Sequence, residues 1–186
     1  MTIHIKNMVC NRCITAVEDV FRNSEIDFVS VNLGWVDIST EISKNQLEKL
    51  NENLKKIGFE ILEDASQKQI ESIKKLILEK VQNLDIDEDF LLSKYLSDQL
   101  NKEYSSISKV FSQTENITLE QYFILQKIEK VKELLIYREL TLSQIADKLG
   151  YKTVQHLSQQ FKKITGFSPS QFQELKEKKR LPIDFI

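Results

Sequence analysis

The chain has 186 residues, a formal net charge of −2 and a 41% share of hydrophobic residues. This length fits one large domain or two small ones with an ordinary core, and no apolar run reaches the ~20 residues that span a membrane. The N-terminus lacks a basic start followed by an apolar stretch, so we expect no secretory signal, no membrane partner and a cytoplasmic protein.

Charge is unevenly distributed along the chain. Residues 1–65 hold 7 Lys or Arg against 11 Asp or Glu, a balance of −4. Residues 66–186 hold 19 against 17, a balance of +2. Taken alone, this weak positive excess in the rear part indicates DNA binding only faintly.

Strand patterns dominate the beginning of the chain. Apolar and polar residues alternate over 2–6, which predicts a first strand. Two further short strands are predicted at 28–31 and 35–39. The Asn and Gly at 32–34 suit the tight turn of a hairpin between them.

Two helices and a last strand complete this first part. Apolar residues spaced three or four apart predict helices around 14–21 and 47–57, the second with Ser43 as its N-cap and Gly58 at its end. Residues 59–62 predict the last strand. The order β-α-β-β-α-β predicts an antiparallel sheet with two helices on one face.

The rest of the chain is predicted to be helical. Apolar residues at helical spacing predict a helix over 67–83, and we expect a short hinge into that helix near residues 63–67. The predicted division is a domain at 1–63, a connecting helix at 64–84 and a second domain at 85–186.

Residues 140–172 predict two helices joined by a tight turn. Thr141 is expected to cap the first helix, and Gly150 to end it. The inward positions are Ile145, Ala146 and Leu149 in the first helix and Leu157, Phe161 and Ile164 in the second. This arrangement is a helix-turn-helix, whose second helix enters the major groove of DNA.

The outward face of that second helix has side chains suited to DNA. Gln155 and Gln159 can each form two hydrogen bonds with adenine, and basic side chains suit phosphates. His156 fits a solvated surface position as well as a base contact. The predicted DNA-binding residues of this unit are Lys152, Thr153, Gln155, His156, Gln159, Lys162 and Lys163.

The same stretch resembles the signature of the AraC-type transcription regulators. The residues that carry the resemblance are Ile145-Ala146, Gly150-Tyr151, Phe161-Lys162-Lys163, Gly166 and Ser168-Pro169, with Phe172 after them. The DNA-binding module of that family has two helix-turn-helix units bridged by one long helix. The alternative is a helical bundle with incidental helix-turn-helix geometry, which the tandem units and the Gly-x-Ser-Pro ending disfavour.

The resemblance to this family covers residues 85–178. Residues 90–111 resemble the first unit, although no Gly marks its turn, and 119–135 resemble the bridge, with Lys127 where the family often has Arg. The resemblance implies that the recognition helix of the first unit points Ser105, Ser106, Ser108 and Lys109 outward. From this serine-rich surface we expect modest base readout.

Two cysteines, Cys10 and Cys13, lie where the first strand passes into the first helix. In a reducing compartment so close a pair indicates metal binding or redox activity rather than a disulfide framework. The helix N-terminus favours thiolate at Cys13, and Arg12 adds positive charge nearby. Two thiolates satisfy a soft ion of low coordination, chiefly Cu(I), but do not fill the four positions of structural zinc.

With the predicted element order, Met8-x-Cys10-x-x-Cys13 resembles the motif of the heavy-metal-associated domain of copper chaperones and metal-transporting ATPases. The resemblance covers residues 1–63 and implies a ferredoxin-like fold with Cys10 and Cys13 as metal ligands. It also implies that Met8 anchors the loop and that Phe59 lies near it. Asn7 stands where the family usually has Gly. A redox-active pair and an inert pair are the alternatives.

The predicted fold class is therefore α+β, a ferredoxin-like domain followed by an all-α double helix-turn-helix domain. The predicted function is a sequence-specific DNA-binding transcription regulator that responds to a soft metal ion, most simply Cu(I), with Hg(II), Ag(I), Cd(II) and Zn(II) as other candidates. The predicted partners are double-stranded DNA, with RNA polymerase and a metallochaperone as further candidates, for a monomer or homodimer.

Other functions compete with this prediction. The first domain could bind a protein or sense thiol redox state, or the chain could be a metallochaperone or redox enzyme with a helical docking module. The tandem helix-turn-helix pattern disfavours the last of these. Since the two histidines lie far apart in the sequence and no nucleophile elbow or phosphate-binding Gly loop occurs, we expect no enzyme.

Overall fold

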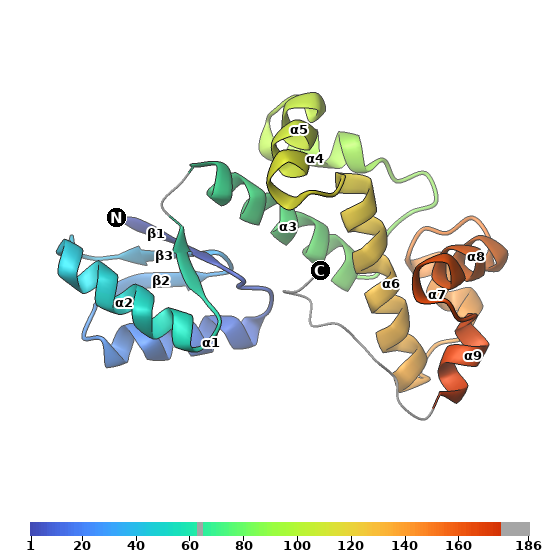
Figure 1. The fold of residues 1–186 in the computed structure, drawn as a ribbon, viewed down its shortest axis with the longest axis horizontal. Coiled ribbons are helices and arrows are strands. Elements are labelled where there is room, and N and C mark those ends of the chain that lie inside the picture. The colour runs from blue at the N-terminus through green and yellow to red at the C-terminus, as the bar shows by residue number, and fades with distance from the viewer. Residues whose placement is uncertain (63–64, 176–186) are drawn as a thin grey trace. The chain divides into compact units, whose positions relative to one another are not determined.

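The computed structural model describes residues 1–62 and 65–175, and the chain divides into two compact units, Met1–Lys75 and Leu76–Ile186 (Figure 1). The division lies within one helix, α3 (Ala65–Gln82). Part of the hinge predicted at 63–67 lies outside the described residues. No helix among those described is long and apolar enough to cross a membrane.

The first unit contains a four-stranded antiparallel sheet with strand order β2-β3-β1-β4. Its elements are β1 (Thr2–Lys6), α1 (Asn11–Asn23), β2 (Phe28–Asn32), β3 (Trp35–Ile38), α2 (Lys44–Lys56) and β4 (Glu60–Leu62). The β-α-β-β-α-β order is the one that the sequence predicts. In Figure 1 both helices lie on the same side of the sheet.

The alternation of residues along β1 explains how the sheet and helices share a core. Ile3 and Ile5 are buried, and they pack in one cluster with Phe21 of α1 and Leu54 of α2. The capping box of Ser43 begins α2, since its side chain accepts a hydrogen bond from the backbone of the third helical residue. Periodicity and caps thus place the elements of this unit where the sequence predicts them.

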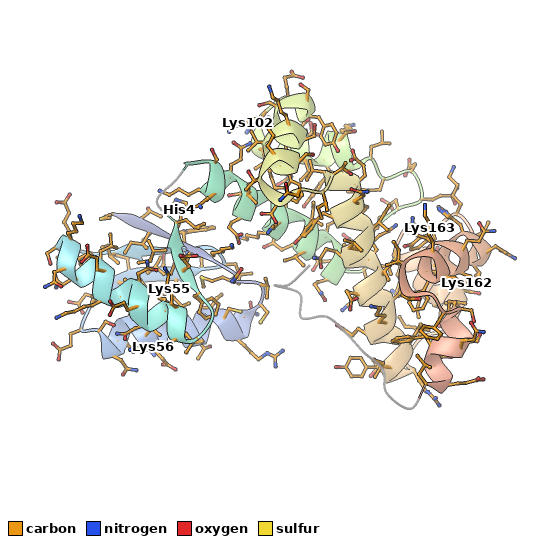
Figure 2. The ribbon with its side chains drawn as sticks, viewed as in Figure 1. His4, Lys55, Lys56, Lys102, Lys162 and Lys163 are labelled. Carbon is orange, nitrogen blue, oxygen red and sulfur yellow. The ribbon has the colours of Figure 1, made fainter. Side chains whose placement is uncertain are left out.

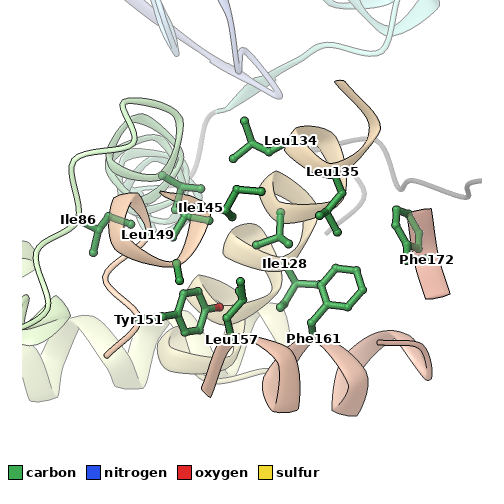
Figure 3. Close-up of a cluster of buried hydrophobic side chains, with 13 residues drawn as sticks. Ile86, Ile128, Leu134, Leu135, Ile145, Leu149, Tyr151, Leu157, Phe161 and Phe172 are labelled. Atoms are coloured by element: carbon green, nitrogen blue, oxygen red, sulfur yellow. The ribbon is translucent and has the colours of Figure 1, made fainter. Parts of the chain in front are cut away.

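The described elements of the second unit are helices, apart from an isolated bridge between Ile86 and Leu149. After the second half of α3 come α4 (Leu92–Leu100), α5 (Tyr104–Glu115), α6 (Leu119–Tyr137), α7 (Leu142–Lys148), α8 (Val154–Thr165) and α9 (Pro169–Glu174). The long helix α6 forms the centre of this unit, because the core residues of α7, α8 and α9 gather around its buried side (Figure 3).

One inward position predicted from the sequence is wrong. Ile164, expected to face the core, is 41% exposed, whereas Leu157 and Phe161 of the same helix are buried. The place beside Phe161 is taken by Phe172, whose ring meets it edge-on at a centroid distance of 5.5 Å. Because α9 fills that side of the core, Ile164 remains at the surface at the end of α8.

Candidate functional site

The turn between α7 and α8 is tightly constructed. Thr141 begins α7 with a capping box, and Gly150 follows its last residues with a φ of +66°. A Cβ atom at Gly150 would lie 2.7 Å from the carbonyl oxygen of Asp87 and 2.7 Å from Cγ2 of Ile86. Glycine is therefore required both by the backbone conformation and by the close approach of another segment.

The N-terminal end of α8 is fixed by a cap. Thr153 accepts a hydrogen bond from the backbone N–H of His156 at 3.0 Å. Beyond it, Leu157 and Phe161 turn inward, and the predicted DNA-binding residues lie on the exposed face. The exposed residues are Lys152, Thr153, Gln155, His156, Gln159, Lys162 and Lys163.

This exposed face is basic and amide-rich. Residues 152–165 contain three lysines and no Asp or Glu. Lys162 and Lys163 lie in the last turn of α8, where cations complement the negative end of the helix dipole (Figure 2). The arrangement can contact phosphates with its lysines and base edges with its amides.

The first of the two predicted helix-turn-helix units is formed by α4 and α5. Asn101 ends α4 in the left-handed conformation, with a φ of 50°, so it takes the role for which the sequence offers no Gly. Ser105, Ser106 and Lys109 are exposed on α5. Ser108 is half-buried, and its hydroxyl donates to the carbonyl oxygen of Ser105 at 3.2 Å.

Helix α6 contacts the turn between α7 and α8 through a buried lysine. Lys127 is only 8% exposed, and its Nζ donates a hydrogen bond to the carbonyl oxygen of Leu149 at 2.9 Å. The same Nζ lies 3.8 Å from the centroid of the Tyr151 ring. Burial lowers the pKa of Lys127 to about 8 and raises the pKa of Tyr151.

In the first compact unit of the chain, Met1–Lys75, the two cysteines lie at the beginning of α1. Cys10 is the N-cap residue and Cys13 stands in the first turn, with 3.6 Å between the two Sγ atoms. Both side chains are half-buried. Met8 and Phe59 are 5% and 8% exposed and belong to the core cluster of this unit, against which Cys13 packs.

The two thiols differ in acidity. Burial raises the pKa of Cys13. Burial acts in the same direction on Cys10, but hydrogen bonds from Cys13 and Arg12 outweigh it, so the pKa of Cys10 is lowered. The position of Cys13 near the start of a helix predicts that Cys13 is the thiolate. In the structure the pKa of Cys10 is lowered instead, because Cys13 lies deeper in the core.

The thiols of Cys10 and Cys13 are the side chains that could hold a soft metal ion. The two Sγ atoms lie 3.6 Å apart, close enough for both to contact one ion. Within the described residues, no group of three or more His, Cys, Asp or Glu side chains is arranged to hold a metal. The donor set therefore suits low coordination better than a four-ligand structural zinc site.

Comparisons with known proteins match the second unit. The model of the family described as "Helix-turn-helix domain" matches residues 96–175. These residues include α5, α6, α7, α8 and α9 in full, and so both predicted recognition helices and the bridge between them.

Over residues 96–175 the chain is similar to the helix-turn-helix domain family.

A curated relative and two solved structures are similar to this part of the chain. The probable transcriptional regulator LumQ of Photobacterium leiognathi is 28% identical over 107 residues, which are 50% of this chain and 42% of that protein. The chain thus spans less than half the length of this relative.

The C-terminal domain of AraT, a response regulator from Geobacillus stearothermophilus, is 24% identical with a TM-score of 0.50, over 61% of this chain and 88% of that one. The C-terminal domain of the response regulator yesN from Fusobacterium nucleatum is 29% identical with a TM-score of 0.48, over 55% and 99%.

Two features of the helix-turn-helix domain could not be predicted from the sequence. The contact of Gly150 with Ile86 and Asp87 joins residues more than sixty positions apart, and no local pattern signals it. The contact of Lys127 with Tyr151 had a weak signal, a basic residue in the apolar stretch of the bridge, but its partner could not be read from spacing.

Proposed function

We propose that this chain is an AraC-type DNA-binding transcription regulator in which α8 reads the major groove. The observation that carries the proposal is the exposed face of α8, which presents amide, imidazole and lysine side chains on a helix capped and packed as a recognition helix. The match of residues 96–175 to the helix-turn-helix family supports the same function.

The proposed contacts divide by chemistry. Gln155 and Gln159 pair with base edges, His156 contacts a further base, and Lys152, Lys162 and Lys163 contact phosphates. Helix α5 makes the weaker contribution, because Ser105, Ser106 and Ser108 have short side chains and Lys109 is its one long basic side chain among these positions.

We further propose that the dithiol of Cys10 and Cys13 binds a soft metal ion, chiefly Cu(I), in a domain of the ferredoxin-like, heavy-metal-associated kind. The 3.6 Å between the sulfurs and the lowered pKa of Cys10 support binding. Cys10 and Cys13 would hold such an ion, which would link their two thiolates. Since Cys10 caps α1 and Cys13 lies in its first turn, holding both sulfurs fixes the loop that begins this helix.

Such binding regulates transcription only if the ion binds two states of the protein with different affinity. The decisive experiment measures DNA binding to the promoter region of the chain's own gene by fluorescence anisotropy. The apo protein, the protein with one equivalent of Cu(I) under reductant, and a Cys10→Ser/Cys13→Ser variant are compared. We expect a change in affinity or stoichiometry with Cu(I) in the wild type alone.

Two other results would contradict one or both parts of this proposal. Equal DNA binding in all three samples contradicts metal sensing and leaves the regulator function in place, with the first unit as a protein-binding module. Failure of every sample to bind DNA above its non-specific affinity contradicts the regulator function itself.

A thiol-redox sensor is the second candidate for the first unit. Two sulfurs at 3.6 Å, one of them with a lowered pKa, also suit oxidation to a disulfide. The same anisotropy assay on protein oxidised and reduced without metal tests it. A change that follows oxidation, and is absent with Cu(I) under reductant, favours the redox sensor over the metal sensor.

A further inference from the structure

One buried lysine in the second unit connects the bridge helix to the DNA-facing surface. Lys127 of α6 contacts both the end of α7, through the carbonyl oxygen of Leu149, and the residue after Gly150, through the ring of Tyr151. The Leu149 carbonyl belongs to the C-cap of α7, a position where the helix itself supplies no hydrogen-bond partner.

Packing alone does not explain a lysine at this position. Burying an ammonium group is unfavourable unless polar partners compensate it, and an apolar side chain of similar length would fill the same space. The partners of Lys127 are one carbonyl oxygen at 2.9 Å and the faces of two aromatic rings, Tyr151 at 3.8 Å and Phe123 at 5.2 Å. Two of these contacts, those with Leu149 and Tyr151, hold the turn between α7 and α8, whereas Phe123 lies on α6 itself.

Tyr151 connects Lys127 to the exposed face of α8. It is buried, and its hydroxyl donates a hydrogen bond to Oε1 of Gln160 on α8 at 2.6 Å. The edge of its ring system meets the imidazole of His156, with 5.4 Å between centroids and planes at 81°. The ring is therefore held from α6 by Lys127 and from α8 by Gln160, and it supports the exposed His156 from beneath.

We propose that Lys127 is a positioning residue for DNA recognition, which fixes the α7–α8 turn and, through Tyr151, orients His156 to discriminate between base pairs. This inference rests on the proposed function. A His side chain that packs against a fixed ring samples fewer orientations than a free one, so its N–H can be aimed at an acceptor on a base edge.

Discrimination between base pairs and non-specific affinity for DNA should depend on different residues. Phosphate contacts, which supply most non-specific binding, depend on exposed lysines such as Lys162 and Lys163 and not on the orientation of one imidazole. Loss of Lys127 should therefore reduce the preference for one base pair while leaving non-specific binding nearly unchanged.

The test uses the full chain and DNA sites selected from a random pool by the wild type. Affinities for the selected site and for each single base-pair change are measured by anisotropy for Lys127→Met, Lys127→Arg, His156→Ala and the double variant Lys127→Met/His156→Ala. Lys130→Met is the matched control, because Lys130 lies on the same helix and is equally buried but bonds to Gln82 and Glu133.

We expect Lys127→Met to lose about fivefold to tenfold discrimination at one base-pair position, since a tenfold change corresponds to 1.4 kcal/mol, the scale of one base contact. His156→Ala should lose the same discrimination, the double variant should lose no more, and Lys127→Arg, which keeps the cation, should retain it. Non-specific affinity should stay within about twofold.

Other results overturn the inference. These are equal losses on all DNA sequences, additive losses in the double variant, or the same loss in Lys130→Met. Should Lys127→Met not fold, Tyr151→Phe removes only the hydroxyl bonded to Gln160, and unchanged discrimination in that variant overturns the inference as well. A wild type without sequence preference instead contradicts the proposed function, so the two failures are distinguishable.

Discussion

At Gly150 a single missing methyl group lets two segments of the second unit touch. The backbone N–H of Ile86 donates to the carbonyl oxygen of Lys148 at 3.2 Å, and Ile86 forms an isolated parallel bridge with Leu149. These contacts place residues 84–88 directly against the α7–α8 turn, where they line a cavity of about 250 Å³ with Tyr151. The turn is thus shaped from outside the helix-turn-helix as well as from within.

Gly150→Ala should destabilise the protein more than Gly166→Ala. Both glycines have positive φ, which costs any other residue about 1 kcal/mol, but only Gly150 has atoms within 4 Å of the added methyl group. Relief of that overlap should add about 1–3 kcal/mol. Urea unfolding monitored by circular dichroism measures both losses, and equal losses would show that the close approach of Ile86 is not tight.

The free energy of unfolding should depend on pH because Lys127 has different pKa values in the folded and the unfolded chain. Burial lowers its pKa to about 8 from an ordinary 10.5, so between these values the unfolded chain binds more protons and the free energy of unfolding rises with pH. The cost of the buried charge is fully present below pH 8. The difference between the two pKa values corresponds to about 3 kcal/mol.

The difference in stability between the wild type and Lys127→Met isolates this effect. The ring of Tyr151 contacts Lys127, and burial raises the pKa of its hydroxyl. Subtracting the variant's unfolding free energy removes the contribution of this hydroxyl. The free energy of unfolding of the wild type, relative to that of Lys127→Met, should rise from below pH 8 to above pH 10. If the difference between the two unfolding free energies does not change with pH, Lys127 is not a buried lysine that loses its proton in this range.

At the scale of elements, the two recognition helices differ in the charge that they present. Helix α8 exposes Lys162 and Lys163 in its last turn, whereas α5 exposes Lys109 among serines. Each lysine that contacts a phosphate contributes about one to the slope of log K against log salt. The unequal charge predicts that α8 dominates the salt dependence of DNA binding.

Lys162→Gln/Lys163→Gln should lower that slope by about two. The control Lys44→Gln/Lys49→Gln removes the same charge from exposed positions on α2 and should leave the slope within about 0.3 of the wild type. Anisotropy titrations at several salt concentrations provide the slopes. An equal reduction in both variants would mean that net charge, and not contact, governs binding.

The elements could be predicted because their signals are local. Ser43 and Thr141 cap helices that begin one residue later, and apolar spacing of three or four marks the buried side of α1 and α2. Ile164 could not be placed, because local spacing does not show that Phe172 of another helix packs against Phe161. The dithiol could be found from its spacing, but which thiol is the more acidic depends on burial that spacing does not contain.

At the scale of the whole molecule, each compact unit has a hydrophobic cluster of its own among the described residues. One gathers around the sheet and includes Phe21, and the other gathers around α6 and includes Phe161. Both phenylalanines are fully buried. Since each core belongs to one compact unit, damage to one should leave most of the packing of the other intact.

Phe21→Ala and Phe161→Ala should each cost about 3–5 kcal/mol, each in its own unit. Hydrogen exchange followed by mass spectrometry should show lost protection within Met1–Lys75 for the first variant and within Leu76–Leu175 for the second. Phe21→Ala should leave the DNA affinity of the apo protein within about twofold, since α8 packs in the other core. Equal loss of protection in both units would indicate that they unfold as one.

The position of the unit division within α3 has a practical consequence for anyone who wishes to isolate the DNA-binding half. A fragment that begins at residue 85, or at residue 96 where the family match begins, lacks Val81 from its core, the Gln82 side chain that accepts from Lys130, and the Leu76 carbonyl that accepts from Tyr95. Such a fragment should be less stable and more prone to aggregate than one that includes α3 from Ala65. The shortest soluble DNA-binding fragment therefore starts well upstream of the part that sequence similarity marks out.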